Sequence, residues 1–243
     1  MTTSLFVFAH QDDEIAAATR ILVARRHGQR VVCVYLTDGA FNVPSAIRNE
    51  ESRRALGRLG VTELLFAEYP DGNLPEHARE ALAFLESHVD EVGEVCTLAW
   101  EGGHQDHDAA HVIALAFARR RGIPCREVPL YNGRGTPRSF FRVLRPVGEG
   151  WTRRRVRFSE ALVVLSMVRF YKSQRKTFAG LLPEAMFELF IARRTHVRDA
   201  DPRRLTTKPH KGLLFYERRF GYPYERFVGA MEGIIAAIPA TPS

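Results

Sequence analysis

Short apolar runs alternate with longer amphipathic stretches throughout the first half of the chain. Runs rich in β-branched and aromatic residues are predicted to be strands, at residues 4–10, 30–37, 63–69, 94–100 and 125–131. The stretches between them have helical spacing, at residues 13–27, 46–59, 75–90 and 107–121. Continuous apolar strands separated by helices are typical of a parallel sheet that helices cover on both faces. Because such crossovers are right-handed, we predict an α/β fold with a Rossmann-like, doubly wound, mostly parallel sheet.

The alternation weakens after about residue 135. Helices are predicted within residues 157–178, where Ser159 is the predicted N-cap, and within 181–194 and 222–238. The intervening residues 198–212 are polar and are predicted to form a loop. The second half is therefore expected to elaborate the sheet rather than to repeat its pattern.

Nothing in the sequence divides the chain into separate units. It has 243 residues, which suffice for a substantial core, and it contains neither an internal repeat nor a low-complexity linker. We therefore predict a single domain over residues 1–243. Its Rossmann-like core is expected at 1–135 and a C-terminal elaboration at 136–243.

The net charge bears on the class of partner, and the cysteine pattern bears on the redox state of the compartment. The net charge of +7 favours anionic partners, such as phosphorylated small molecules, membrane surfaces or nucleic acid, without choosing among them. The three cysteines are scattered without a CxxC pair, which is typical of free thiols in a reducing compartment. No signal peptide and no transmembrane segment is evident, so a cytoplasmic location is expected. A homo-oligomer is compatible with these totals.

Two segments rich in histidine and acidic residues follow two of the predicted strands. The sequence AHQDDE (9–14) follows the first strand, and WEGGHQDHDAAH (100–111) follows the fourth. In the common strand order 3-2-1-4-5 these strands are neighbours, and their carboxyl ends flank the crevice where ligands bind. The two segments are therefore predicted to meet. A divalent cation would relieve the repulsion among their carboxylates.

The spacing of these residues indicates a metal site with open positions. His10 ends the first strand, Asp13 lies one helical turn further on, and His107 begins the helix after the fourth strand. Two imidazoles and a carboxylate are typical of catalytic zinc, although Fe²⁺ or another divalent cation would also fit. His111, four residues after His107, is a rival ligand.

Other polar residues of the two segments are candidates for proton transfer. Asp12 is predicted to act as general base on metal-activated water. His104 is predicted to serve as acid or oxyanion donor, with Asp106 orienting it. The alternative for Asp12, Asp13 and Glu14 is an acidic helix start that interacts with the helix dipole.

These motifs resemble a known family. AHQDDE (9–14) and GGHQDH (102–107) are similar to the paired motifs of the LmbE-like, or PIG-L-type, N-acetylglucosamine deacetylases. The family usually has Pro where Gln11 and Gln105 stand. Further pieces follow in the family's order over most of residues 4–175, namely LTDG (36–39), Arg48 with Glu51, PDGN (70–73) and YKSQ (171–174).

The resemblance implies roles for individual residues. It implies metal ligands at His10, Asp13 and His107, a base at Asp12, and a stabilising or protonating group at His104. Residues that contact the sugar are implied at Arg48 and Asp71. Some members carry a Tyr where Gly102 stands, so that Tyr's role in polarising the amide carbonyl is vacant here or filled by His104 or another residue.

The expected activity is metal-dependent removal of an N-acetyl group from an N-acetylglucosamine-type conjugate, which could be phosphorylated, nucleotide-linked or lipid-linked. A related amidase that acts on a sugar-thiol or other amide is the alternative. A Rossmann-like sugar or nucleotide binder is disfavoured because no GxGxxG follows the first strand. Nucleic acid is disfavoured because the carboxylates of the crevice would repel phosphate.

Two weaker signals complete the set. Asp38, after the second strand, is either a second-shell or substrate-binding residue or part of an Asp-Gly turn. The aromatic and basic stretch FYERRFGYPYERF (215–227) is either a packed C-terminal layer or a roof over the pocket. The basic runs at 118–121 and 153–157 are expected to be solvated surface.

Overall fold

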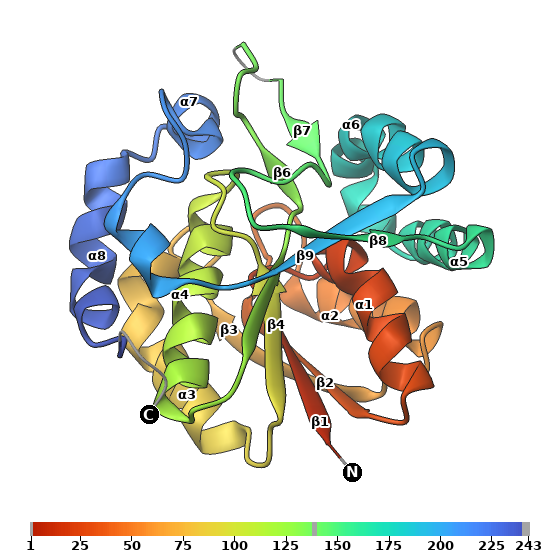
Figure 1. Cartoon of the computed structure of the whole chain (residues 1–243), viewed down its shortest axis with the longest axis horizontal. Helices are drawn as coiled ribbons and strands as arrows, with labels where there is room; N and C mark the ends of the chain where they lie inside the picture. The colour runs from red at the N-terminus through yellow and green to blue at the C-terminus, as the bar shows by residue number, and fades with distance from the viewer. Residues whose placement is uncertain (1, 138–139, 240–243) are drawn as a thin grey trace.

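The computed structural model describes residues 2–137 and 140–239. Its centre is a sheet of order β3-β2-β1-β4-β5-β9-β8 (Figure 1). The parallel strands are β1 (Thr3–Phe8), β2 (Arg30–Thr37), β3 (Glu63–Tyr69), β4 (Glu94–Leu98) and β5 (Cys125–Val128). Strands β9 (Arg194–Asp199) and β8 (Thr152–Arg155) extend the sheet in antiparallel pairing. The predicted doubly wound α/β fold is confirmed.

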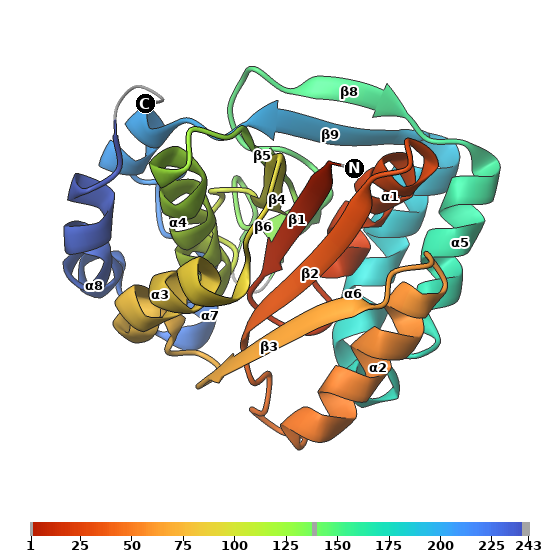
Figure 2. The same ribbon diagram turned by 90° about the horizontal axis from the view of Figure 1, so that it is seen from below.

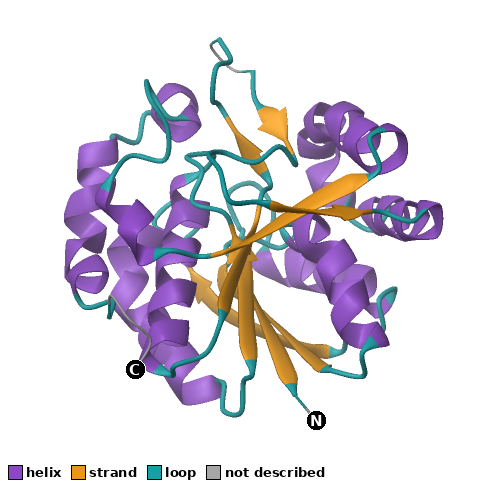
Figure 3. Cartoon of the chain, viewed as in Figure 1, coloured by secondary structure: helices purple, strands orange, loops and turns teal. Residues whose placement is uncertain are grey.

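Helices cover both faces of the sheet (Figures 2 and 3). One face carries α3 (Ala78–His88), α4 (Gln105–Arg120) and α8 (Tyr224–Ala236). The other carries α1 (Glu14–Arg26) and α2 (Ser45–Gly57), with α5 (Phe158–Val168) packed against them. No helix of the described ranges is long and apolar enough to cross a lipid bilayer.

The alternation of side chains along β1 explains the two layers. Leu5 and Val7 are buried in the core shared with α3, α4 and α8. Phe6 and Phe8 are buried in the core shared with α1 and α5. Because successive side chains of a strand point to opposite faces, a strand that is apolar throughout requires helices on both sides.

Short elements surround the carboxyl ends of the central strands, and most of them belong to the C-terminal half of the chain. These are η1 (Leu74–His77), the β-hairpin β6 (Tyr131–Asn132) and β7 (Arg142–Val143), η2 (Lys172–Gln174), α6 (Arg175–Met186), the π-helical turn η3 (Phe187–Ile191), η4 (Pro202–Thr206) and α7 (Phe215–Phe220). Figure 1 shows α6 and α7 on opposite sides of this hairpin.

The helix predicted within 157–178 is interrupted. It begins after Arg157, whose backbone N–H is capped by Glu160, so Ser159 is not the N-cap. The helix ends after Val168, and Ser173 further along donates both its N–H (2.9 Å) and its hydroxyl (2.5 Å) to Glu51 of α2. In a continuous helix that N–H would bond to a preceding carbonyl instead.

Strand β9 overlaps the start of the loop predicted at 198–212, and β8 was not predicted at all. Arg198 of β9 donates to Glu127, which is buried on β5, and Arg204 donates to the same carboxylate (2.7 Å). A buried ion pair of this kind replaces the apolar side chains by which a strand is ordinarily detected. The basic run at 153–157 overlaps edge strand β8, and its side chains are largely exposed, as predicted.

Candidate active site

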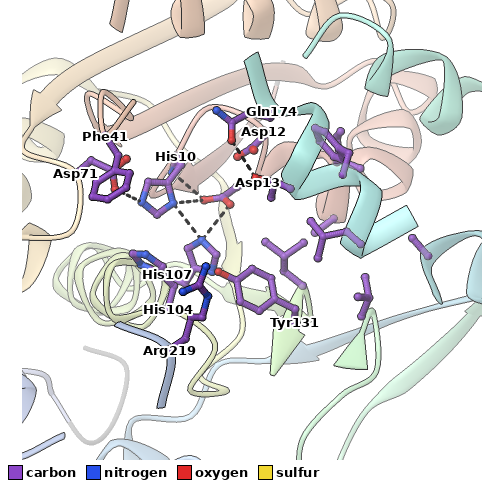
Figure 4. A pocket seen from close by; sticks show the side chains of 18 of the residues that line it. His10, Asp12, Asp13, Phe41, Asp71, His104, His107, Tyr131, Gln174 and Arg219 are labelled. Atoms are coloured by element: carbon purple, nitrogen blue, oxygen red, sulfur yellow. Dashed lines mark hydrogen bonds and ion pairs between the residues drawn. The ribbon is translucent and has the colours of Figure 1, made fainter. Parts of the chain in front are cut away.

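The two histidine-rich segments meet where β1 and β4 end. These strands are neighbours and parallel, so their carboxyl ends lie at the same edge of the sheet. His10 follows β1, and His107 lies in the first turn of α4, which follows β4. Their ring nitrogens, Nδ1 of His10 and Nε2 of His107, are 3.1 Å apart (Figure 4).

Three of these residues point their donor atoms at one small volume. The Nε2 atom of His107 lies 3.1 Å from an oxygen of Asp13, and Nδ1 of His10 lies 3.7 Å from its other oxygen. All three side chains are buried. Two imidazole nitrogens and a carboxylate that converge in this way form the donor set of an open, catalytic divalent-metal site.

The charge around His10 also fits a cation. Its Nε2 atom lies 3.1 Å from Asp71 and 3.1 Å from Asp106, while Asp13 lies on its Nδ1 side. Burial opposes protonation of this imidazole, but the three carboxylates outweigh burial and raise the pKa of His10 well above its ordinary value. A metal ion would supply the positive charge that these carboxylates attract.

Asp106 contacts both His10 and His104, through different atoms. Its Oδ2 atom faces His10 and accepts the N–H of Gly72 (2.7 Å), whereas this carboxylate lies 3.9 Å from the ring of His104. Its backbone N–H donates to Nδ1 of His104 (3.1 Å), so Asp106 contacts His104 through its main chain while its carboxylate turns toward the loop after β3. The carboxylate holds Nε2 of His10, so that Nδ1 of this ring faces Asp13 and His107.

Asp13 is fixed as a carboxylate. Its Oδ2 atom accepts the backbone N–H groups of Ala9 (3.1 Å) and His10 (2.8 Å). Burial opposes ionisation, but His107 and His10 outweigh burial and hold the pKa of Asp13 well below its usual range. Asp13 is therefore charged and ready to bind a cation.

Asp12 has an unusual backbone and faces the cavity. Its φ of 138° lies in the region that favours glycine. Its carboxylate is 3.4 Å from the guanidinium of Arg48, and its N–H donates to Glu14 (3.0 Å). Burial raises the pKa of Asp12 to about 6, against the opposing charge of Arg48. A carboxyl group held at such a pKa beside a metal position is suited to proton transfer.

His104 is a neutral donor. Burial lowers the pKa of its imidazole to about 3. Its Nδ1 atom accepts the N–H of Asp106 (3.1 Å), so the single proton of the neutral ring resides on Nε2. The ring lines the cavity and packs edge-on against Phe220, with centroids 4.8 Å apart.

The residues suggested for substrate binding divide into two groups. Asp71 lines the cavity and faces His10. Arg48 also reaches the cavity, but its side chain donates to the carbonyls of Gly39 (3.2 Å) and Gln11. Asp38 does not line the cavity: its carboxylate accepts the N–H groups of Ala40 (3.0 Å) and Asp71 (3.1 Å). The turn role of Asp38 is therefore the one that the structure favours over substrate contact.

The rival ligand His111 lies outside the cluster. Its Nδ1 atom bonds to the carbonyl of Leu98 (2.8 Å) and lies 3.3 Å from Glu127. Burial lowers the pKa of this imidazole. His111 thus fastens α4 to the sheet and is not part of the metal-binding set.

Tyr131 is a cavity residue that sequence reasoning missed. Its ring packs edge-on against His107, with centroids 5.2 Å apart, and it lines the cavity (Figure 4). Burial raises the pKa of its hydroxyl well above the ordinary value, so it remains protonated. A side chain on Gly103 would collide with the carbonyl of Tyr131, at 2.1 Å, so the glycine is required for this approach.

The aromatic and basic stretch at 215–227 contributes both to a packed layer and to the wall of the cavity. Phe215 and Tyr216 are buried, whereas Arg219 and Phe220 line the cavity. Leu214 fills the space beside Gly102, where an added Cβ would lie 2.7 Å from it. A side chain at position 102 would therefore collide with Leu214.

The chain is similar to known proteins in fold rather than in overall sequence. No curated protein matches the chain by sequence. Its fold is similar to the zinc-inhibited form of a teicoplanin deacetylase (TM-score 0.61, 16% identity, 82% of this chain and 99% of that chain). It is also similar to N,N'-diacetylchitobiose deacetylase from Pyrococcus horikoshii (TM-score 0.58, 16% identity, 82% and 84%).

The same fold hosts other chemistry. The 4-carboxy-2-hydroxymuconate hydratase of Pseudomonas putida is similar with a TM-score of 0.50 and 13% identity, over 82% of this chain and 95% of that chain. At these identities the solved structures establish the shared fold. The model of the PIG-L family, GlcNAc-PI de-N-acetylase, matches residues 5–118. This match spans both motifs, 9–14 and 102–107, and confirms the resemblance of the chain to the PIG-L-type, LmbE-like deacetylases.

Proposed function

We propose that this protein is a metal-dependent N-deacetylase that hydrolyses the acetamide of an N-acetylglucosamine-type sugar conjugate. The family match and the deacetylases among the structural neighbours support this activity. The observation that carries the proposal is the convergence of His10, Asp13 and His107 beside the cavity-facing Asp12.

The metal would be held by His10, Asp13 and His107. Zn²⁺ fits this donor set, and Fe²⁺ is the second choice. A divalent cation supplies Lewis-acid activation of the water and of the amide carbonyl. Asp106 and Asp71 hold the far nitrogen of His10, which keeps its near nitrogen directed at the same point.

The chain's own groups would carry the protons. Asp12 removes a proton from the attacking water as the new C–O bond forms, and Arg48 keeps its carboxylate in place. The Nε2–H of His104 donates to the developing oxyanion, and the hydroxyl of Tyr131 is a second donor at this side of the cavity. Asp12 then passes its proton to the leaving nitrogen as the C–N bond breaks, which yields acetate and an amino sugar.

The sugar would lie against the polar loops after β2 and β3. Asp71 is the residue there that faces the cavity and can accept a hydroxyl, and Arg219 is a cationic group on the opposite wall (Figure 4). Arg48 serves mainly to position Asp12, since its donors are occupied by backbone carbonyls and that carboxylate.

Acetate release tests the activity directly. Metal-loaded and chelator-treated protein should be assayed with free, nucleotide-linked and lipid-linked N-acetylhexosamines, with acetate and free amine measured together. Metal-dependent release of both in equal amounts is expected from at least one of them. Bound metal without release from any of these substrates would reject the deacetylase and favour the amidase, to be tested with sugar-thiol conjugates.

A further inference from the structure

The cavity is larger than the polar site at its centre. Its volume is about 780 Å³, and it extends from the histidine cluster into the space between α5, α6 and the π-helical turn η3. Apolar side chains of these helices line the extension, among them Leu165, Val168, Leu181, Leu182 and Ala185. We call this part of the cavity the apolar chamber.

The apolar chamber and the polar loops proposed to bind the sugar lie on opposite sides of His10. In Figure 4, Asp71 and Phe41 stand on one side of His10, whereas Tyr131 and Gln174 stand on the other, toward the helices of the chamber. An amide at the metal position therefore has polar loops toward one substituent and apolar helices toward the other. With the sugar on the loops, the acyl substituent points into the chamber.

The lining of the chamber is suited to hydrocarbon. Among the described residues that line the cavity, α5, α6 and η3 contribute no charged side chain. Leu165, Leu181 and Leu182 are only partly buried because they border this space. Water in contact with such a surface is unfavourable, so displacing it with an alkyl chain is favourable. An acetyl methyl group would leave most of this surface uncovered.

The local backbone is irregular where the chamber is formed. Pro183 interrupts the hydrogen bonding of α6, and the following residues form the π-helical turn. Glu188 of this turn points away from the chamber and pairs with Arg194 (2.5 Å) and Arg145 (3.0 Å), while the next residue, Leu189, lines the chamber. Such turns are frequent at functional sites. Here the turn places the charged Glu188 away from the chamber and the apolar Leu189 at its wall.

We propose that the apolar chamber binds the acyl chain of the substrate, and that the substrate class is an amino sugar N-acylated with a chain longer than acetyl. The inference rests on the proposed amide hydrolysis and extends its substrate. In that reaction the water oxygen bonds to the acyl carbon, the C–N bond breaks, and a water proton goes to the amine. A fatty carboxylate and an amino sugar are released.

Binding of a homologous series tests the chamber separately from catalysis. The affinities of N-acetyl-, N-hexanoyl- and N-decanoylglucosamine should be measured by calorimetry on the full chain carrying Asp12→Asn. We expect the Kd to fall about three- to fourfold for each added methylene until the chamber is filled. Equal affinities across the series would overturn the proposal, whatever the result of the acetate assay.

A second series identifies the substituent that occupies the chamber. Alkyl glycosides of N-acetylglucosamine carry the same chains on the anomeric oxygen. If these bind more tightly with chain length and the N-acyl series does not, the chamber holds the aglycone and the proposal is wrong. We expect the N-acyl series to show the stronger dependence.

Matched tryptophan variants locate the effect. Ala185 lines the chamber, whereas Ala179 is an exposed residue of the same helix that does not line the cavity. Ala185→Trp should reduce the ratio of decanoyl to acetyl affinity at least tenfold, and Ala179→Trp should leave that ratio unchanged. An unchanged ratio in folded Ala185→Trp would contradict the proposal.

Discussion

The carboxylate of Asp12 lies 3.4 Å from the guanidinium of Arg48, and the backbone that presents it has a φ of 138°. Non-glycine residues in this region cost about 1–3 kcal/mol and occur where the surrounding structure enforces them. The chain thus keeps a strained aspartate at the mouth of the histidine cluster. This relationship supports a proton-transfer role for Asp12 and leads to two predictions.

Asp12→Asn should abolish most of the activity while metal binding is retained. The amide occupies the same volume but cannot accept a proton, so kcat should fall about 10²- to 10⁴-fold. Turnover of acetylated substrate and metal content should be measured on the same preparation. Near-normal turnover with full metal content would exclude Asp12 as the base.

Asp12→Gly should be more stable than Asp12→Ala. Both variants lose the carboxylate, but only glycine adopts a φ of 138° without strain, so we expect a difference of about 1 kcal/mol in the free energy of unfolding. Urea titrations provide the comparison. Ala179→Gly in α6 is the control, because there glycine should be less stable by about 1 kcal/mol. The same order at both positions would argue against strain at Asp12.

Asp106→Asn should weaken metal binding. Asp106 lies 3.1 Å from Nε2 of His10, and loss of such a partner lowers metal affinity about 10- to 100-fold. Asp108→Asn is the matched control, since its carboxyl group accepts the N–H groups of Glu101 and Gly102, and burial raises its pKa to about 8. Competition with a chromophoric chelator measures both affinities. Equal affinities in the two variants would refute the role given to Asp106.

Glu160→Gln should destabilise the protein at neutral pH more than at acidic pH. Glu160 of α5 accepts from Arg26 of α1 and Arg154 of β8 (2.8 Å), and its side chain is fully buried. Burial opposes its ionisation, but the hydrogen bonds and arginines outweigh burial and lower the pKa of Glu160. The stability that it contributes is therefore present above its unfolded pKa, and it is lost as pH falls through the lower folded pKa.

The expected loss for Glu160→Gln is about 2 kcal/mol at pH 7, typical of hydrogen bonds to a charged group. Below the pKa of a free Glu, about 4.3, the difference from the wild type should shrink. Denaturant unfolding at several pH values checks this. A difference that is constant with pH would show that ionisation of Glu160 does not stabilise the fold.

The apolar strands made the central sheet predictable, but charged pairing concealed its edge. Strands β1 and β2 contain continuous apolar runs, at 5–9 and 31–36, because helices cover both of their faces. Strand β9 does not, because Arg198 is satisfied by the buried Glu127 of β5. That pairing depends on residues far apart in the chain, which a local pattern does not reveal.

The meeting of the histidine and carboxylate residues was predictable for a related reason. His10 and His107 each follow a strand within a dense polar motif, and the strand order brings those motifs together. Tyr131 carries no comparable signal, because it is one aromatic residue after β5 whose position depends on the approach of Gly103. The leucines of α5 and α6 have the spacing of ordinary core residues. Only the cavity distinguishes them from core.

The most direct test of the central claim is metal content in a matched pair of histidine variants. His107 directs Nε2 at Asp13 and His10, whereas His111, one helical turn on, bonds to Leu98 and lies outside the cluster. Each should be replaced by Asn and analysed for zinc and iron after purification. We predict that His107→Asn loses most of its metal while His111→Asn retains the wild-type content. Full metal content in folded His107→Asn would contradict the account.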